Sequence, residues 1–231
     1  TFDYYLKNNI DSLTLTLEVL ENDKVIRTYT NKKKSNFKSW PGGPSKPQVL
    51  PSKKGVNRFT WDFRRNPLPS IHKVFIFGGL GGSSVAPGKY TLKMTLGDVI
   101  SETEVTILPN PKVISSSEDF IAQQKMLVSI ENTVKEMHES VNQMRSAKTQ
   151  LSHYAKLLKD SKNVDSLLEK GKKLTKRINS WEENLIQAKQ KTFQDVINFN
   201  NKLNAQLIQL KSYLDQANPK VTNGAKERFD D

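Results

Sequence analysis

The stretch SLTLTLEVL at residues 12–20 alternates apolar and polar side chains with a period of two. Leu13, Leu15, Leu17 and Val19 share one face, and the intervening polar residues share the other. Successive side chains of a β-strand point to opposite faces of its sheet. The pattern therefore predicts a strand with one buried face, and it makes the first part of the chain a β structure.

Two turn signals in the first part of the chain predict hairpins. A turn at residues 21–23 leads into a second stretch of β-branched and aromatic residues, which we expect to pair with the first. Further along, a Gly-Asp pair at 97–98 separates the strand-like segments 89–96 and 99–108. Between the two hairpins, residues 31–54 are irregular and rich in proline and glycine, which predicts a long connection.

The alternation returns at residues 55–63, where Phe59, Trp61 and Phe63 interleave with polar residues. We expect Trp61 to occupy the core, because a buried indole contributes a large apolar area. Several short strands separated by regular turn signals favour an immunoglobulin-like or fibronectin type III-like β-sandwich. The sequence predicts this domain over residues 1–111.

The rest of the chain, residues 112–231, shows a helical period instead. Serines and acids at 115–119 are typical of a helix N-terminus. Three apolar stripes follow, with members three, four or seven residues apart: Leu127, Ile130, Val134, Met137, Val141, Met144 and Leu151; Val164, Leu167, Leu174, Ile178, Trp181 and Leu185; Val196, Leu203, Leu207, Leu210 and Leu214. Short connections predict an antiparallel three-helix bundle, with a truncated fourth helix near the end. Gly171 replaces an apolar residue in the second stripe, which predicts a close approach of two helices there.

Positive charge is concentrated in the irregular connection. The chain has a net charge of +12 and no cysteine, which excludes disulfides and thiolate chemistry. Residues 24–65 hold twelve Lys or Arg and one acid. A binding module using residues 31–58 would suit an anionic polysaccharide, whereas nucleic acid is not the expected partner. The candidate contact residues are Lys32, Lys33, Lys34, Phe37, Trp40, Lys53 and Lys54. Burial of Trp40 as a loop anchor is the competing interpretation.

The sequence contains no pattern of an active site. His138 and His153 are fifteen residues apart on one expected helix, too far to share a metal. The glycine-rich run at 78–82 leads to Pro-Gly and a strand rather than a helix, so a loop or bend at the sandwich edge is favoured over a phosphate loop. We expect no catalytic residue, metal or cofactor, and no apolar run is long enough to span a bilayer.

Several core and turn motifs together resemble one bacterial family. They are YYLK at 4–7, GVNRFTWD at 55–62, PGKYT at 87–91, PNPKV at 109–113, NQMR at 142–145 and TFQDVIN at 192–198. This combination is similar to the C-terminal region of large sortilin-type proteins with Asp-box (BNR) repeats, frequent in Bacteroidetes and labelled glycosyl hydrolases. The resemblance implies an upstream β-propeller, and export to the periplasm, the outer-membrane surface or the extracellular space. No active-site residue of the family falls within this sequence.

Three functional hypotheses follow. The first is a non-catalytic accessory region that packs on its own N-terminal β-propeller or docks another envelope protein. The second is a polyanion- or carbohydrate-binding module built on the basic connection. The third is part of a glycoside hydrolase whose active site lies in the preceding N-terminal region. In all three, the chain itself is not an enzyme.

Overall fold

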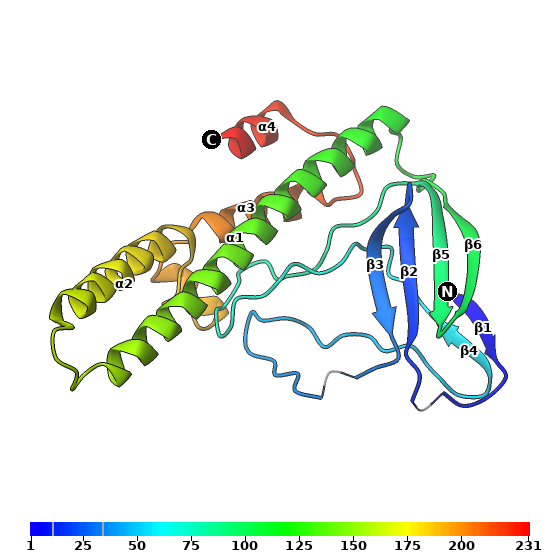
Figure 1. The fold of residues 1–231 in the computed structure, drawn as a ribbon. Coiled ribbons are helices and arrows are strands. Elements are labelled where there is room, and N and C mark those ends of the chain that lie inside the picture. Colours follow the sequence, from blue (N-terminus) through cyan, green and yellow to red (C-terminus); the bar gives the residue numbers. More distant parts are fainter. Residues whose placement is uncertain (11, 34) are drawn as a thin grey trace.

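A computed structural model describes residues 1–10, 12–33 and 35–231, and it has a β part followed by an α part (Figure 1). Within these residues there are two antiparallel sheets, of two and four strands. The strands are β1 (Phe2–Leu6), β2 (Leu15–Glu21), β3 (Lys24–Thr30), β4 (Gly55–Phe59), β5 (Gly88–Leu96) and β6 (Val99–Ile107). Strand β1 pairs with β4, and the larger sheet has the order β3-β2-β5-β6. The predicted order of β first and α second is confirmed.

The strand predicted from alternation forms as β2, and Leu15, Leu17 and Val19 of its predicted inward face are buried. Leu13 was expected on the same face, but it precedes the strand and is 51% exposed. The hairpin to β3 is confirmed as well. Its two turn residues, Asn22 and Asp23, have φ angles of 49° and 62°. Positive φ at both central residues matches the right-handed twist of paired strands, and Asn and Asp tolerate this conformation best after glycine. The hairpin between β5 and β6 also forms as predicted.

The strand predicted at 55–63 is shorter than expected. It ends at Phe59, and Phe63 adopts a left-handed φ of 56° with 49% of its surface exposed. Trp61 is buried as predicted, with its ring against Tyr90 at 5.6 Å between centroids. Its indole Nε1 donates to the Arg64 carbonyl at 3.0 Å, so the polar edge of the ring is also satisfied.

Four α-helices and one short 3₁₀ helix make up the described α part. They are α1 (Ser117–Leu157), α2 (Asp165–Leu185), η1 (Phe193–Ile197), α3 (Leu203–Leu214) and α4 (Asn223–Asp230). The predicted N-terminal cap is confirmed: Ser116 and Asp119 form a capping box at the start of α1. The predicted third stripe divides between two elements, because Val196 lies in η1 and the α-helix begins only at Leu203.

Two apolar cores hold the molecule together. The first, the sheet core, is formed by residues of the strands and of the segments that connect them. It contains Leu6, Ile10, Leu15, Leu17, Val19, Ile26, Tyr29, Leu50, Phe59, Trp61, Val85, Tyr90 and Leu92. The helix core contains Leu68, Ile71, Val74, Ile76, Leu80, Leu127, Ile130, Val134, Met137, Val141, Ile186, Leu207, Ile208 and Leu214. Five members of the helix core come from the connection between β4 and β5. The predicted boundary at residue 111 stays a prediction, but this connection packs with the helices.

The glycine-rich run does not form the expected loop at a sandwich edge. Leu80 belongs to the helix core, and Ser83 is fully buried. A Cβ on Gly78 would lie 2.8 Å from the side chain of Ile208 on α3. A Cβ on Gly82 would lie 2.3 Å from the Arg65 carbonyl oxygen. The glycines therefore permit tight packing of this run between the sheets and the helices.

Candidate functional site

The basic connection was the predicted ligand surface, and its lysines are exposed where they are described. Lys33, Lys53 and Lys54 are exposed, and Lys32 donates from Nζ to the Ser12 carbonyl at 3.0 Å. Lys34 lies outside the described residues. The structure places Lys32 and Lys33 just after β3 of the four-stranded sheet, and Lys53 and Lys54 just before β4 of the two-stranded sheet.

The aromatic residues of this connection are only half exposed. Trp40 donates from its indole Nε1 to the Val74 carbonyl at 2.8 Å, and its ring makes an edge-to-face contact with His72, with 5.5 Å between the ring centroids. The next turn also bonds to the same segment, since the Ile76 amide donates to the Gly42 carbonyl at 3.2 Å. These contacts attach the connection to the segment that enters the helix core, as the anchor interpretation of Trp40 expects.

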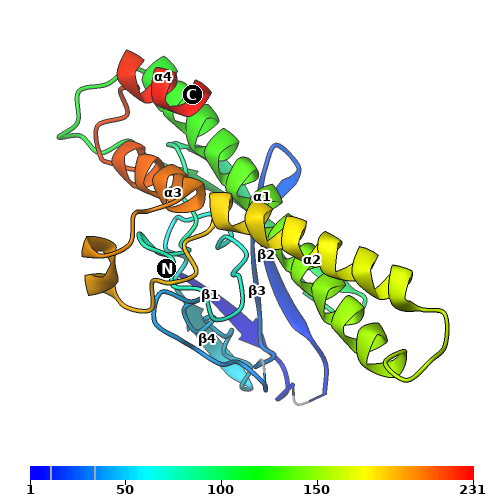
Figure 2. The same ribbon diagram turned by 90° about the vertical axis from the view of Figure 1, so that its left-hand side faces the viewer.

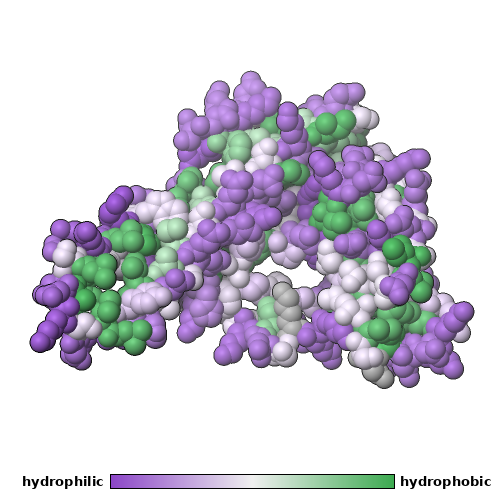
Figure 3. Space-filling view, viewed as in Figure 1, coloured by the Kyte–Doolittle hydropathy of each residue, from purple (hydrophilic) through white to green (hydrophobic). Residues whose placement is uncertain are grey.

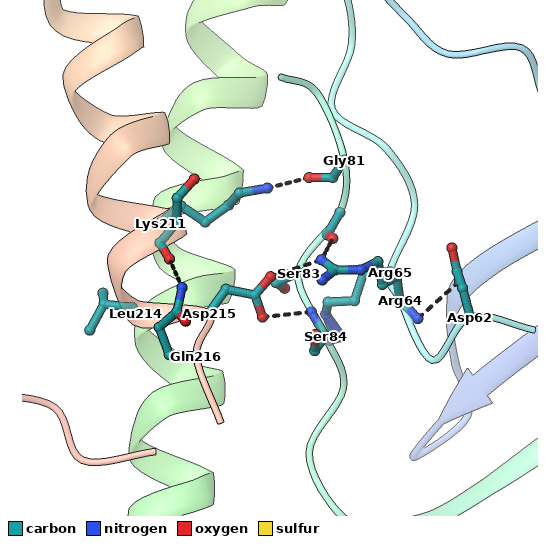
Figure 4. A network of polar contacts seen from close by, with 12 residues as sticks. Asp62, Arg64, Arg65, Gly81, Ser83, Ser84, Lys211, Leu214, Asp215 and Gln216 are labelled. Carbon is teal, nitrogen blue, oxygen red and sulfur yellow. Dashed lines mark hydrogen bonds and ion pairs between the residues drawn. The ribbon is translucent and has the colours of Figure 1, made fainter. Parts of the chain in front are cut away.

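A polar network joins the β part to the helices (Figure 4). Asp215 of α3's C-terminal cap accepts from Arg64 at 2.8 Å and from the Ser84 amide at 3.0 Å. Glu131 of α1 accepts from the Ser83 amide at 2.5 Å. Lys211 of α3 donates to the Gly81 carbonyl, and its Nζ lies 3.8 Å from a carboxylate oxygen of Glu131. The network therefore connects α1, α3 and the residue 81–84 segment.

Burial governs the protonation of this network. Glu131 and Lys211 are 9% and 5% exposed. Burial raises the pKa of Glu131 above its ordinary value, and the Ser83 amide and Lys211 partly offset that rise. Burial lowers the pKa of Lys211, and Glu131 and Asp215 oppose that change. Each charged group has a partner within the chain, so the arrangement is suited to holding the two parts together.

A second buried contact fixes the middle of α1 to the β4–β5 connection. His138 is fully buried, and its Nδ1–H donates to the Pro69 carbonyl at 2.7 Å. Burial lowers the pKa of His138. Two turns later, Arg145 donates to the His72 carbonyl at 3.0 Å and to Glu182 of α2 at 2.8 Å. His138 and Arg145 therefore hold α1 against the β4–β5 connection, and Arg145 also holds it against α2.

The distal half of the α1–α2 hairpin forms a groove that the sequence reasoning missed. Its volume is about 910 Å³. Apolar side chains of both helices line it: Leu151, Tyr154, Ala155, Leu158, Leu167, Leu168 and Leu174. Figure 3 shows apolar surface gathered over this end of the hairpin and bordered by hydrophilic residues. Several of these side chains are well exposed, among them Tyr154 at 60% and Leu167 at 58%.

The groove changes the interpretation of Gly171. We expected two helices to approach closely there, but a Cβ at this position would have no heavy atom within 4 Å. Gly171 instead lines the groove. The predicted stripe of α2 is also largely uncovered, because Ile178 is its only buried member. No sequence signal predicted the groove, because the third stripe spans residues 196–214 and is nearly as long as the second at 164–185, whereas α3 begins only at Leu203.

Neither metal chemistry nor membrane crossing gains support from the described residues. Across residues 1–10, 12–33 and 35–231, no three His, Cys, Asp or Glu side chains gather as they would around a metal ion. In the same ranges, no helix combines the length and the apolar character needed to traverse a bilayer. Searches against family models, curated proteins and solved structures found no match to this chain.

Proposed function

We propose that this chain is a non-catalytic structural and docking module of a larger exported protein. In finer terms, it is an immunoglobulin-like or fibronectin type III-like sandwich followed by an antiparallel helical bundle. The observation that carries the proposal is the uncovered apolar groove on the α1–α2 hairpin. Exposed apolar patches of this kind mark interaction sites on soluble proteins.

The rigid attachment of the hairpin supports this role. The β4–β5 connection contributes to the helix core, and polar contacts of buried Glu131 and His138 and of partly buried Asp215 fix the helices to it. Beyond these contacts, α1 and α2 project together away from the sheets (Figures 1 and 2). A projecting element on a fixed base can hold a partner at a defined distance and angle.

The family resemblance suggests where such a partner would come from. In the sortilin-like, Asp-box repeat proteins that the motifs resemble, a β-propeller precedes this region. We infer that the hairpin contacts the parent's own propeller or another envelope protein, at the periplasm or the cell surface.

Cross-linking mass spectrometry on the intact parent protein in isolated envelopes would test this proposal. With a lysine-reactive reagent, we expect Lys170, Lys172 and Lys176 to link to another domain or another polypeptide. These lysines line the groove and are exposed. If they form links only within this chain, the docking role fails.

Binding of an anionic polysaccharide through residues 31–58 is the second candidate. The exposed Lys33, Lys53 and Lys54 favour it, because they place positive charge at both ends of the connection. Titration with heparin at low and high salt would test it: binding that weakens as salt rises, and is lost in a Lys53→Glu/Lys54→Glu variant, would support it. An absence of binding at low salt would eliminate it.

A further inference from the structure

The open groove follows from the lengths of the helices. Helix α1 has 41 residues and is about 60 Å long at 1.5 Å per residue. Helix α3 has only 12 residues, or about 18 Å. Helix α3 therefore covers one part of α1, around Leu127–Val141 in the helix core, and leaves the distal part of the α1–α2 pair without a third helix. The groove lies in this uncovered part.

The charges around the groove have a single sign. All charged residues that line it are lysines: Lys148, Lys159, Lys170, Lys172 and Lys176. Lys148 pairs with Glu182 at 3.6 Å, whereas the other four make no ion pair with any residue that the structure describes. An adjoining hollow of about 550 Å³ is lined by Arg145, Lys148, Thr149, Ser152, His153 and Lys156.

This charge argues against a second copy of the chain as the occupant. Residues 145–179 contain ten Lys or Arg and three acids, a net charge of +7. Two such surfaces would repel each other when brought together. A partner with an apolar stripe would cover the apolar side chains that form the floor of the groove. Carboxylates on both sides of that stripe would pair with the lysines that form its rim.

We propose that this groove binds an acidic amphipathic α-helix, which completes a three-helix arrangement with α1 and α2. The inference rests on the proposed docking function and names the class of its partner. Side chains at positions i, i+3, i+4 and i+7 of the partner fill the apolar floor. Glutamates or aspartates that flank this stripe pair with the groove lysines. The open space at Gly171 lets the partner's side chains approach the backbone of α2 closely.

The shape of the groove favours a helix over a lipid surface. It is a hollow of about 910 Å³ lined by side chains of both α1 and α2, and a ridge of helical side chains fits such a depression. A flat bilayer would touch exposed side chains beside the groove, such as Leu157, without reaching into the hollow. Anionic vesicles are therefore a control for the test.

The test uses the whole chain and fluorescent peptides of about 18 residues, which is five helical turns. One peptide carries leucines at i, i+3, i+4 and i+7 with flanking glutamates. A second has lysines in place of the glutamates, and a third has the composition of the first in scrambled order. Fluorescence anisotropy is measured at low and high salt. We expect the acidic amphipathic peptide to bind at least about tenfold more tightly than either control, with an affinity that falls as salt rises.

Two variants and one matched control locate the site. Gly171→Leu places a side chain in the open space of the groove and raises helix propensity, so it blocks binding without unfolding the chain. Lys170→Glu/Lys172→Glu/Lys176→Glu reverses the charge of three rim residues, and we expect this variant to bind the lysine peptide more tightly than the glutamate peptide. Lys7→Glu/Lys24→Glu/Lys112→Glu makes the same change of charge at three exposed lysines outside the helices and outside residues 31–58, and it leaves peptide affinity within about twofold.

The outcomes are distinct. Loss of binding in the Gly171→Leu variant with unchanged circular dichroism, together with reversed peptide preference in the charge-reversed variant, supports the inference. Equal binding of all peptides, binding to anionic phosphatidylserine vesicles alone, or self-association blocked by Gly171→Leu overturns it. If no peptide binds but the groove lysines still cross-link to another polypeptide in the envelope, the acidic helix is wrong and the docking function stands. If those cross-links are also absent, both fail.

Discussion

The carboxylate of Glu131 on α1 lies 3.8 Å from the ammonium group of Lys211 on α3, and both buried side chains bond to residues 81–83, at the end of the glycine-rich run. Glu131 accepts from the Ser83 amide, and Lys211 donates to the Gly81 carbonyl. A pair in this position does more than hold two helices together. It also fixes both helices to a connection that starts and ends in the sheets.

Removing one partner of this pair is expected to be costly. Lys211→Met leaves the Glu131 carboxylate buried without its counter-charge, and we expect the free energy of unfolding to fall by about 3 kcal/mol. Adding Glu131→Gln removes the orphaned charge but keeps an oxygen for the Ser83 amide, so the double variant should recover about 1 kcal/mol. Urea denaturation followed by circular dichroism measures both. A double variant no more stable than Lys211→Met would show that the charge of Glu131 is already neutralised in another way.

Two neighbouring glycines are expected to differ sharply in their tolerance of a methyl group. A Cβ on Gly82 would meet the Arg65 carbonyl oxygen at 2.3 Å, whereas a Cβ on Gly81 would have nothing within 4 Å. We expect Gly82→Ala to lower the free energy of unfolding by about 3 kcal/mol, because backbone atoms would have to move. The matched Gly81→Ala should change it by less than about 0.5 kcal/mol. Equal melting temperatures for the two variants would contradict the tight packing of this segment.

The sequence predicted those features that depend on local pattern. Alternation at 12–20 predicted β2, and Asn22 with Asp23 supplied the two positive φ angles of its turn. The serines and acids at 115–119 likewise predicted the start of α1, where Ser116 is the cap. The role of Leu68, Ile71 and Leu80 was not, because these residues lie in an irregular segment without periodicity and become core only when the helices cover them. The groove depends on where α3 starts, and the apolar stripe alone placed that start too early.

Buried His138 is expected to make stability depend on pH. Burial lowers its pKa below the ordinary value of 6.5, so the unfolded chain binds a proton more readily than the folded chain as pH falls. Its stabilising contribution is present above pH 6.5 and is lost as pH falls toward the folded-state pKa. The raised pKa of Glu131 acts in the opposite direction, since it favours the folded state as pH falls. The comparison of variants therefore isolates the histidine.

His138→Gln keeps a donor for the Pro69 carbonyl but does not titrate. We expect its melting temperature to vary less than that of the unmodified chain between about pH 7 and pH 5. His153→Gln, at an exposed position on the same helix, is the control and should follow the unmodified chain. Identical pH profiles for His138→Gln and the unmodified chain would show that this side chain is accessible to water or paired in solution.

Trp40 separates the anchor interpretation of the basic connection from the ligand-stacking interpretation. Its indole donates to the Val74 carbonyl and packs on His72. Trp40→Phe keeps a ring but loses the donor, so we expect the free energy of unfolding to fall by about 1 kcal/mol. Trp40→Ala loses the packing as well and should cost about 2 kcal/mol, less than a fully buried aromatic residue would. Tyr5→Ala, at a residue that is 65% exposed, is the aromatic control and should change stability by less than about 0.5 kcal/mol.

Urea denaturation and heparin titration of the same three variants together distinguish the anchor interpretation from the ligand-stacking interpretation. If Trp40→Phe leaves stability unchanged and Trp40→Ala weakens heparin binding, the ring is a ligand platform, and the contact with Val74 does not hold the connection in place.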